Sequence, residues 1–166
     1  MVAYTWDLAV APAGWSVGIT NFRDGTLQFG SHIVSATTPN KFYLALYKQD
    51  ANGNVLWVKT WEATGQSSIS ANAVTVDPAT GQFVVGGSFG GSVLFGSTTI
   101  TAVGNGDNFV VKFNSQGDVL WASSFGGART DQVEIHSLAF DFFGSIYATG
   151  MFHAFMHAGI KCIGGV

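Results

Sequence analysis

Residues 53–57 read GNVLW, and residues 117–121 read GDVLW. A Gly turn followed by an apolar strand therefore occurs twice, about 64 residues apart, and an internal repeat of this kind bears on the whole fold of a chain. The two copies predict a structure built from repeated units. In such a structure Trp57 and Trp121 occupy equivalent positions.

The segments around the two copies also match. In front of each copy lies an alternating segment in which Tyr43 and Tyr47 are replaced by Phe109 and Phe113. We expect the longer turn KQDANGN (48–54) to absorb a difference of about two residues in spacing. The remaining matches are TLQFGSHIVSA (26–36) with SVLFGSTTITA (92–102), and ANAVTVDPATGQFVVGGSF (71–89) with WDLAVAPAGWSVGITNF (6–22) and HSLAFDFFGSIYATGMF (136–152).

Each unit reads as four short strands. Apolar and polar residues alternate with a period of two, and Gly, Asn or Asp stands between the alternating segments. In the second unit the expected strands are NAVTVD (72–77), QFVVGGSF (82–89), NFVVKF (108–113) and DVLWASSF (118–125). Residues 92–102 are expected to add a small hairpin, or a loop packed by Phe95 and Ile100. The fold class is therefore all-β, and a repeated four-stranded antiparallel sheet predicts the blade of a β-propeller.

The segment FVVKFNSQGDVLWASSFGG (109–127) follows an apolar strand ending in Asp, a turn, and an aliphatic strand ending in Gly. This pattern resembles the bacterial seven-bladed beta-propeller repeat family, best over residues 71–127 and fairly at both flanks. The resemblance implies the fold and names no chemistry. It also implies an extracellular or surface-associated protein, although no signal peptide is visible. The first unit departs from the pattern at Ala11, and the third departs at Ala158 and Gly159.

The repeats divide the single propeller-like domain, residues 1–166, into two blades and a half-blade. The expected bounds are about 4–64 and about 69–127 for the two blades and about 132–166 for the half-blade. The third unit is expected to be a half-blade because a third copy of the Trp strand would fall near residue ~185. A propeller typically closes with four to eight blades. We therefore expect an incomplete ring whose half-blade lacks its last two strands.

The outer strand of the half-blade is expected to pair with a neighbouring chain. It contains no Lys or Pro, the residues that usually guard an exposed strand edge. An added strand from another chain satisfies such an edge. The residues expected to form this self-association edge are Ser145, Ile146, Tyr147, Ala148, Thr149 and Gly150.

Charge and composition exclude several classes of partner. The formal net charge is −3, and the seven Lys and Arg residues are not clustered. Nucleic acids and anionic membranes require concentrated basic charge, so neither is an expected partner. No apolar run is long enough to span a bilayer, so membrane insertion is not expected. The single cysteine, Cys162, excludes an intrachain disulfide.

Candidates for chemistry are few. His153, His157 and Cys162 have ligand types suited to Zn²⁺ or Cu, but in a strand or loop their spacing favours an irregular segment over a metal site. Asp77 and Asp141 end strands ahead of Gly turns, where an Asx turn explains a carboxylate. Because no nucleophile, base and orienting group can be named together, we expect neither an enzyme nor a cofactor.

The Trp residues give a second kind of candidate. Trp57 and Trp121 are expected to pack between sheets. Trp6, Trp15 and Trp61 are taken to have no matching aromatic in the second repeat, so they are candidates for an exposed contact, with Trp15 as the first choice for touching a ligand.

These observations lead to three alternatives for function. The first is a non-enzymatic structural protein that self-associates through unfinished blade edges into a closed oligomer or a fibre. The second is a carbohydrate-binding propeller module, in which weak glycan sites add through multivalency. The third is a fragment of a longer propeller protein.

Overall fold

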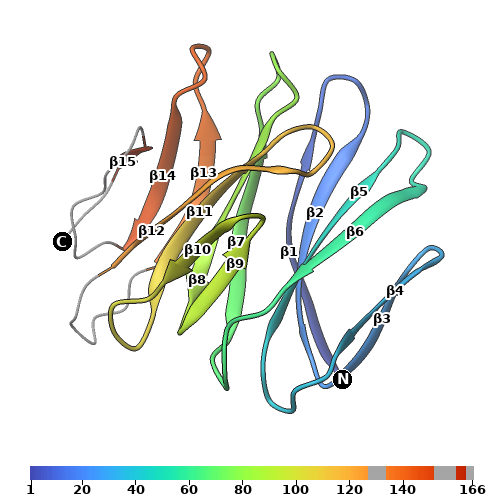
Figure 1. The fold of residues 1–166 in the computed structure, drawn as a ribbon. Helices are drawn as coiled ribbons and strands as arrows, with labels where there is room; N and C mark the ends of the chain where they lie inside the picture. The colour runs from blue at the N-terminus through green and yellow to red at the C-terminus, as the bar shows by residue number, and fades with distance from the viewer. Residues whose placement is uncertain (127–133, 152–159, 164–166) are drawn as a thin grey trace.

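The computed structural model describes residues 1–126, 134–151 and 160–163, and over these residues the chain is all-β (Figure 1). The described ranges contain fifteen strands and no helix. Within them, accordingly, no helix is long and apolar enough to cross a membrane. The all-β prediction is confirmed.

Two antiparallel four-stranded sheets correspond to the first two repeats. The first sheet has the order β1 (Val2–Val10), β2 (Ser16–Arg23), β5 (Tyr43–Gln49) and β6 (Val55–Trp61). The second sheet has the order β7 (Ile69–Val76), β8 (Phe83–Phe89), β11 (Asp107–Phe113) and β12 (Val119–Phe125). The four strands expected in the second repeat are therefore present, with β7 beginning earlier than its sequence pattern indicates.

Each of these sheets carries an additional hairpin between its second and third strands. The hairpins are β3 (Gly25–Phe29) with β4 (His32–Ala36), and β9 (Ser92–Phe95) with β10 (Thr98–Thr101). Each hairpin lies against the last strand of its own sheet, β4 beside β6 and β10 beside β12. Residues 92–102 thus form a hairpin, one of the two alternatives expected for them, and Phe95 and Ile100 are buried as expected.

Equivalent turns fix which residues of the two sheets correspond. In the turn 50–54, the N–H of Asp50 donates to the carbonyl of Asn54, and the N–H of Gly53 donates to the carbonyl of Asp50. The turn 114–118 makes the same two bonds at the same spacing. The expectation that residues 48–54 absorb the length difference is therefore wrong.

The additional length of the first repeat lies in the connection 37–42 between β4 and β5. With the turns aligned, Gln49 is the counterpart of Phe113, and Trp61 is the counterpart of Phe125. Sequence matching placed the difference wrongly because the side chains at these strand ends differ, whereas the backbone hydrogen bonds of the turns do not.

The sheets stack in chain order, with β1 beside β7 and β7 beside β13 (Glu134–Phe140) (Figure 1). Two hydrophobic cores lie between them. The core between the first and second sheets includes Val17, Ile19, Leu44, Leu46, Val74, Val76, Phe83, Val85, Phe89, Phe109, Val111 and Phe113. A smaller core between the second and third sheets includes Ala73, Val84, Val110, Ile135, Leu138, Ile146 and Ala148.

A β-bulge recurs in the first strand of each of the three stacked sheets, and it helps to join neighbouring sheets. The bulges lie at Thr5/Asp7, Ala71/Ala73 and Ile135/Ser137. A bulge releases backbone groups from the strand ladder. Asn21, which is buried, donates to the carbonyl of Ala71 at 2.8 Å and accepts from its N–H at 2.9 Å. The pair of bonds fixes the first sheet against the second.

The third sheet differs from the expectation at its outer edge. It consists of β13, β14 (Ile146–Met151) and β15 (Ile160–Ile163), and β15 pairs with β14 in parallel from Ile146 to Thr149. Unpaired strand edges readily accept another strand, and here a later segment of the same chain takes that place. The edge expected at Ser145–Gly150 is therefore not free along 146–149, and its use in self-association stays a prediction.

Candidate assembly surface

The side of the second sheet that faces the first sheet is largely covered by it. We call this side of each sheet its back face, because it points toward the preceding sheet in the chain. On β7, Val74 and Val76 point to this side and are only 5% and 9% exposed. The first sheet covers them and so removes this apolar surface from water.

We call the back face of the first sheet the open face. Its strand β1 carries apolar residues at the same positions as β7, but no sheet among the described residues covers them. Leu8 and Val10 of β1 correspond to Val74 and Val76, since the following turns begin with equivalent bonds at Ala11 and Asp77. Leu8 is 45% exposed and Val10 is 62% exposed. Equivalent side chains therefore differ in burial because the described residues place no further sheet over β1.

The outer half of the open face is covered by the chain's own hairpin β3–β4. Phe22, Tyr43 and Ala45 form a core there, with Leu27, Phe29, Val34, Ala36 and Val58 packed against it. The ring of Tyr47 lies directly against Gly18, where any Cβ atom would collide with it. Phe29 and Tyr47 are neighbours, with ring centroids 5.0 Å apart.

A cavity of about 490 Å³, which we call the socket, opens between the hairpin tip and the turn 50–54. Its lining holds two aromatic rings and no charged residue: Gln28, Phe29, Gly30, Ser31, Tyr47, Gln49, Gly53, Asn54 and Val55. The amides of Gln28 and Gln49 donate to the backbone carbonyls of Gly30 and Gly53. Burial raises the pKa of Tyr47, so its hydroxyl stays neutral at physiological pH.

The corresponding turn of the second sheet, 114–118, is held by three side chains of the first sheet. The Trp57 ring covers Gly117, where a Cβ would lie 2.7 Å from Trp57 Cζ2. Lys59 Nζ donates to the carbonyl of Gly117 at 2.5 Å, and Lys48 Nζ donates to that of Ser115 at 2.7 Å.

At Gly53, the counterpart of Gly117, nothing lies within 4 Å of the position that a Cβ would take. The socket therefore lies at the turn that corresponds to 114–118. The first sheet covers the turn 114–118, but the described residues leave the turn at the socket uncovered.

The structure separates the five Trp residues by environment. Trp57 and Trp121 pack against the two cores, as expected. Trp61 lies against Phe95 and Phe113, with ring centroids 5.5 and 5.7 Å away, so the expectation that it forms an exposed contact is wrong. Trp6 is 58% exposed.

Trp15, the first choice for a ligand contact, is half-buried between the first and second sheets. Lys48 Nζ lies 3.9 Å from the centroid of its ring, and Gly81 lies against its edge. A cation over the ring occupies the surface that a ligand needs for stacking. Its role in binding stays a prediction, and its position is that of a packing residue.

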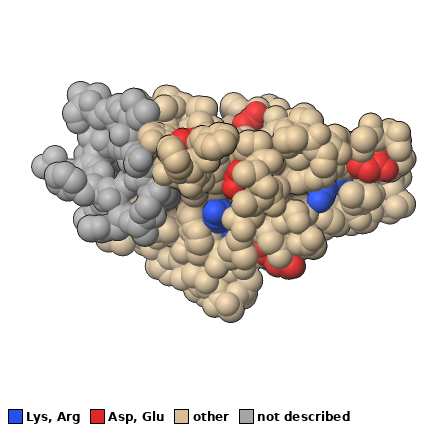
Figure 2. Space-filling view, turned by 90° about the horizontal axis from the view of Figure 1, so that it is seen from above, with Lys and Arg blue, Asp and Glu red and all other residues tan. Residues whose placement is uncertain are grey.

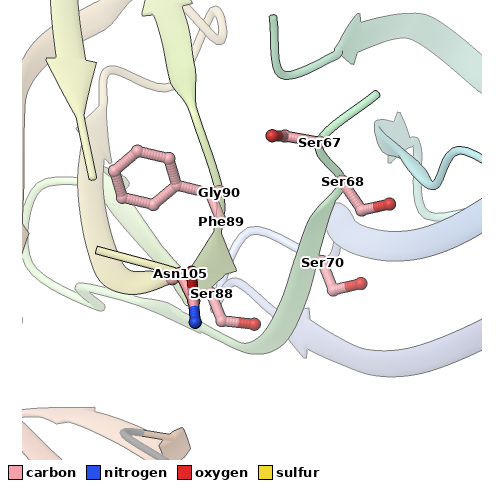
Figure 3. A pocket seen from close by; sticks show the side chains of 8 residues that line it. Ser67, Ser68, Ser70, Ser88, Phe89, Gly90 and Asn105 are labelled. Atoms are coloured by element: carbon pink, nitrogen blue, oxygen red, sulfur yellow. The ribbon is translucent and has the colours of Figure 1, made fainter. Parts of the chain in front are cut away.

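A second, smaller cavity of about 260 Å³ lies at the end of the second sheet where β7 begins and β8 ends. In Figure 3, Ser67, Ser68 and Ser70 lie across from Ser88, Phe89, Gly90 and Asn105. Its lining carries hydroxyl and amide groups but no ionisable side chain, so it offers hydrogen bonds and no acid or base.

Asp77 and Asp141 form the expected Asx turns. Asp77 accepts from the N–H of Ala79, and Asp141 accepts from the N–H of Phe143, both at 2.9 Å. Burial raises the pKa of Asp77, but hydrogen bonds from Thr80 and Ala79 outweigh it and hold the pKa below its usual value. These carboxylates are explained by the turns that they stabilise.

The remaining sequence candidates lie at the C-terminal end of the chain. His153 and His157 are outside the described residues, and so is the side-chain environment of Cys162 on β15. Over the described residues, no three His, Cys, Asp or Glu side chains gather in a way that could hold a metal ion.

Charged side chains are sparse on the molecule. Figure 2 shows acidic and basic groups scattered singly over the end of the sheets seen from above. Nothing on this face forms a concentrated patch of one sign.

The comparisons add no relative to this picture: no model of a known protein family matches the chain, and no curated protein matches it.

Sequence reasoning missed the open face and the socket. The signal for the open face is the apolar alternation of Leu8 and Val10, which matches that of Val74 and Val76. The sequence alone does not say which of these strands is covered, because the cover comes from another sheet.

Proposed function

We propose that the three sheets are blades of a β-propeller segment, and that the protein is a non-enzymatic assembly module that self-associates through its open face. The expected partner surface is the third sheet of a second copy, since the first and third sheets are the two ends of the stack. Each copy then continues the stacking of the copy before it. Such head-to-tail contacts form a ring if the rotation closes and a fibre if it does not.

The observation that carries this proposal is the difference in burial between Leu8 and Val10 and their counterparts Val74 and Val76. The same surface type is buried where another sheet packs on it and exposed where the described residues place no sheet. Covering it gains roughly 25 cal/mol per Å² of apolar area. The edge at 145–150 supports the proposal less well, because β15 already pairs with most of it.

Two charged substitutions on the open face test the proposal. Leu8→Asp with Val10→Asp places two carboxylates where the partner sheet is expected, and both side chains are exposed, so the monomer tolerates them. Leu120→Asp is the matched control, because Leu120 is exposed on β12 away from the open face. We expect the double variant to lose assembly and the control to keep it. Equal assembly of both would overturn the proposal.

The serine-lined cavity supports a second candidate function, the binding of neutral carbohydrate. The hydroxyl and amide groups that line it suit a sugar, because they offer several hydrogen bonds without charge. Glycan-array binding that is lost in Ser70→Trp, which fills the cavity, and kept in Trp15→Ala would place the ligand there rather than at Trp15.

A further inference from the structure

We propose that Phe142 and Phe143 of one copy insert into the socket on the open face of a second copy. This inference rests on the proposed self-association and names the residues that make its central contact. It concerns two features that the fold of a single copy leaves unexplained: two exposed rings on the third sheet and an uncharged, aromatic-walled cavity on the first.

Among the residues that the structure describes, the two Phe rings are the most exposed of the large apolar side chains. Phe142 is 96% exposed and Phe143 is 91% exposed, at the tip of the turn between β13 and β14. The rings contact each other edge to face, with centroids 6.1 Å apart. The hydrogen bonds of the turn are made by backbone groups and by the Asp141 carboxylate, and Phe143 contributes to them only its backbone N–H. Folding of the turn therefore does not account for the aromatic residues.

The socket has the composition that accepts an aromatic ring. Phe29 and Tyr47 provide ring surfaces, and aromatic pairs gain about 0.5–1.5 kcal/mol beyond the area that they bury. The side-chain amides of Gln28 and Gln49 already donate hydrogen bonds to backbone carbonyls, so these donors keep their partners when an apolar ring enters the socket. Gly53 leaves room for a ring where Gly117 is covered by Trp57.

The internal contact between the first and second sheets shows where the turn 141–145 of one copy would lie on a second copy. There, Trp15 at the end of the turn 11–15 touches Gly81, and Lys48 reaches Ser115. When the third sheet of one copy takes the place of the first sheet, its turn 141–145 replaces 11–15, because the two turns make the same backbone bonds.

The counterparts of Gly81 and Ser115 on the second copy are then Gly14 and Ala51. Ala51 directly follows Asp50 in the turn whose Gly53 lines the socket. The two Phe rings, larger than the Pro12 and Ala13 that they replace, extend from this turn toward the socket.

Complementation between two variants tests the contact. The first variant, Phe142→Ser with Phe143→Ser, lacks the rings. The second, Gln28→Glu with Gln49→Glu, places carboxylates in the socket, where an inserted ring would remove them from water. Gln116→Glu is the matched control, because Gln116 is exposed in the corresponding turn of the second sheet. Sedimentation velocity measures the mass of each variant alone and of their equimolar mixture.

We expect each variant alone to assemble at least about tenfold more weakly than the unmodified protein, since central aromatic contacts dominate such interfaces. The mixture restores one intact contact and forms a dimer of one chain of each kind, and Gln116→Glu assembles normally. If the ring-free variant assembles like the unmodified protein, this inference is wrong and the proposed self-association stands. If the unmodified protein is monomeric throughout, both are wrong. A mixture that assembles no better than its components also overturns the inference.

Discussion

Gly53 and Gly117 occupy the same place in two equivalent turns, and they separate the effect of backbone strain from that of packing. Both have positive φ angles, 83° and 81°, so a side chain strains both equally. Only Gly117 is covered, by Trp57. The pair therefore measures how tightly the first sheet packs on the second.

We predict that Gly117→Ala lowers the free energy of unfolding by about 1–3 kcal/mol more than Gly53→Ala does, because the added methyl group overpacks the contact with Trp57. Urea unfolding at concentrations where the protein is monomeric gives both values. Equal losses for the two variants would mean that Trp57 does not hold the turn as described.

The carboxylate of Asp77 is a second case in which a single residue determines a local structure, because it stabilises one turn. Its folded pKa is held below the usual value, so its contribution to stability is complete above the unfolded pKa of about 3.9. That contribution is lost as the pH falls through the folded pKa.

We predict that Asp77→Asn is less stable than the unmodified protein by about 1–2 kcal/mol at pH 7, because Thr80 and Ala79 then donate to a neutral group. The difference is expected to shrink as the pH falls below about 4. Urea midpoints of both proteins between pH 7 and pH 3 test this, since the other carboxylates are common to both. A difference that does not change with pH contradicts the assignment.

At the scale of elements, the repeated hairpins show how one sheet changes the burial of another. Phe95 of β9 is fully buried because Trp61 of the first sheet lies against it. Phe29 of β3 holds the corresponding place but is only half-buried, because the open face is uncovered.

We predict that Phe95→Ala costs about 3–5 kcal/mol, the usual value for a buried Phe. Phe29→Ala is expected to cost clearly less in the monomer. Urea unfolding of the two variants in one buffer makes the comparison. A larger loss for Phe29→Ala would show that the two hairpins are not covered as described.

The strands of the second repeat could be predicted from the sequence, because the Val- and Phe-rich runs in residues 82–89 and 108–113 are short, local and bounded by turn residues. The second hairpin was one of the two alternatives that the sequence left open. The pairing of β15 could not, since a parallel contact between segments distant in sequence leaves no periodic signal. Trp61 was misjudged for another reason: the ungapped match of VLWVKTW (55–61) with VLWASSF (119–125) pairs it with Phe125, a counterpart that the expectation overlooked.

For the candidate site, the sequence shows which residue types are present, but it does not predict how exposed each of them is. Leu8 has the same character as Val74, and Gly53 the same as Gly117. Their different burial follows from which neighbouring sheet is present, which is a property of the whole stack.

At the scale of the whole molecule, the chain is a stack of sheets whose two ends differ. The first sheet ends in the open face with the socket, and the third sheet carries the exposed rings of Phe142 and Phe143. Ends of this kind favour head-to-tail joining over a symmetric contact between like faces. If the three stacked sheets are propeller blades, as proposed, two copies supply six of them, within the typical range of four to eight for a closed propeller.

The mass of the protein as a function of concentration tests the central claim most directly. Sedimentation velocity over a dilution series is predicted to show assemblies heavier than the 17.5 kDa chain, with a dimer as the smallest closed form. Leu8→Asp with Val10→Asp is predicted to abolish them, and Leu120→Asp is not. A constant mass of 17.5 kDa at every concentration, with a cooperative unfolding transition, would contradict the account.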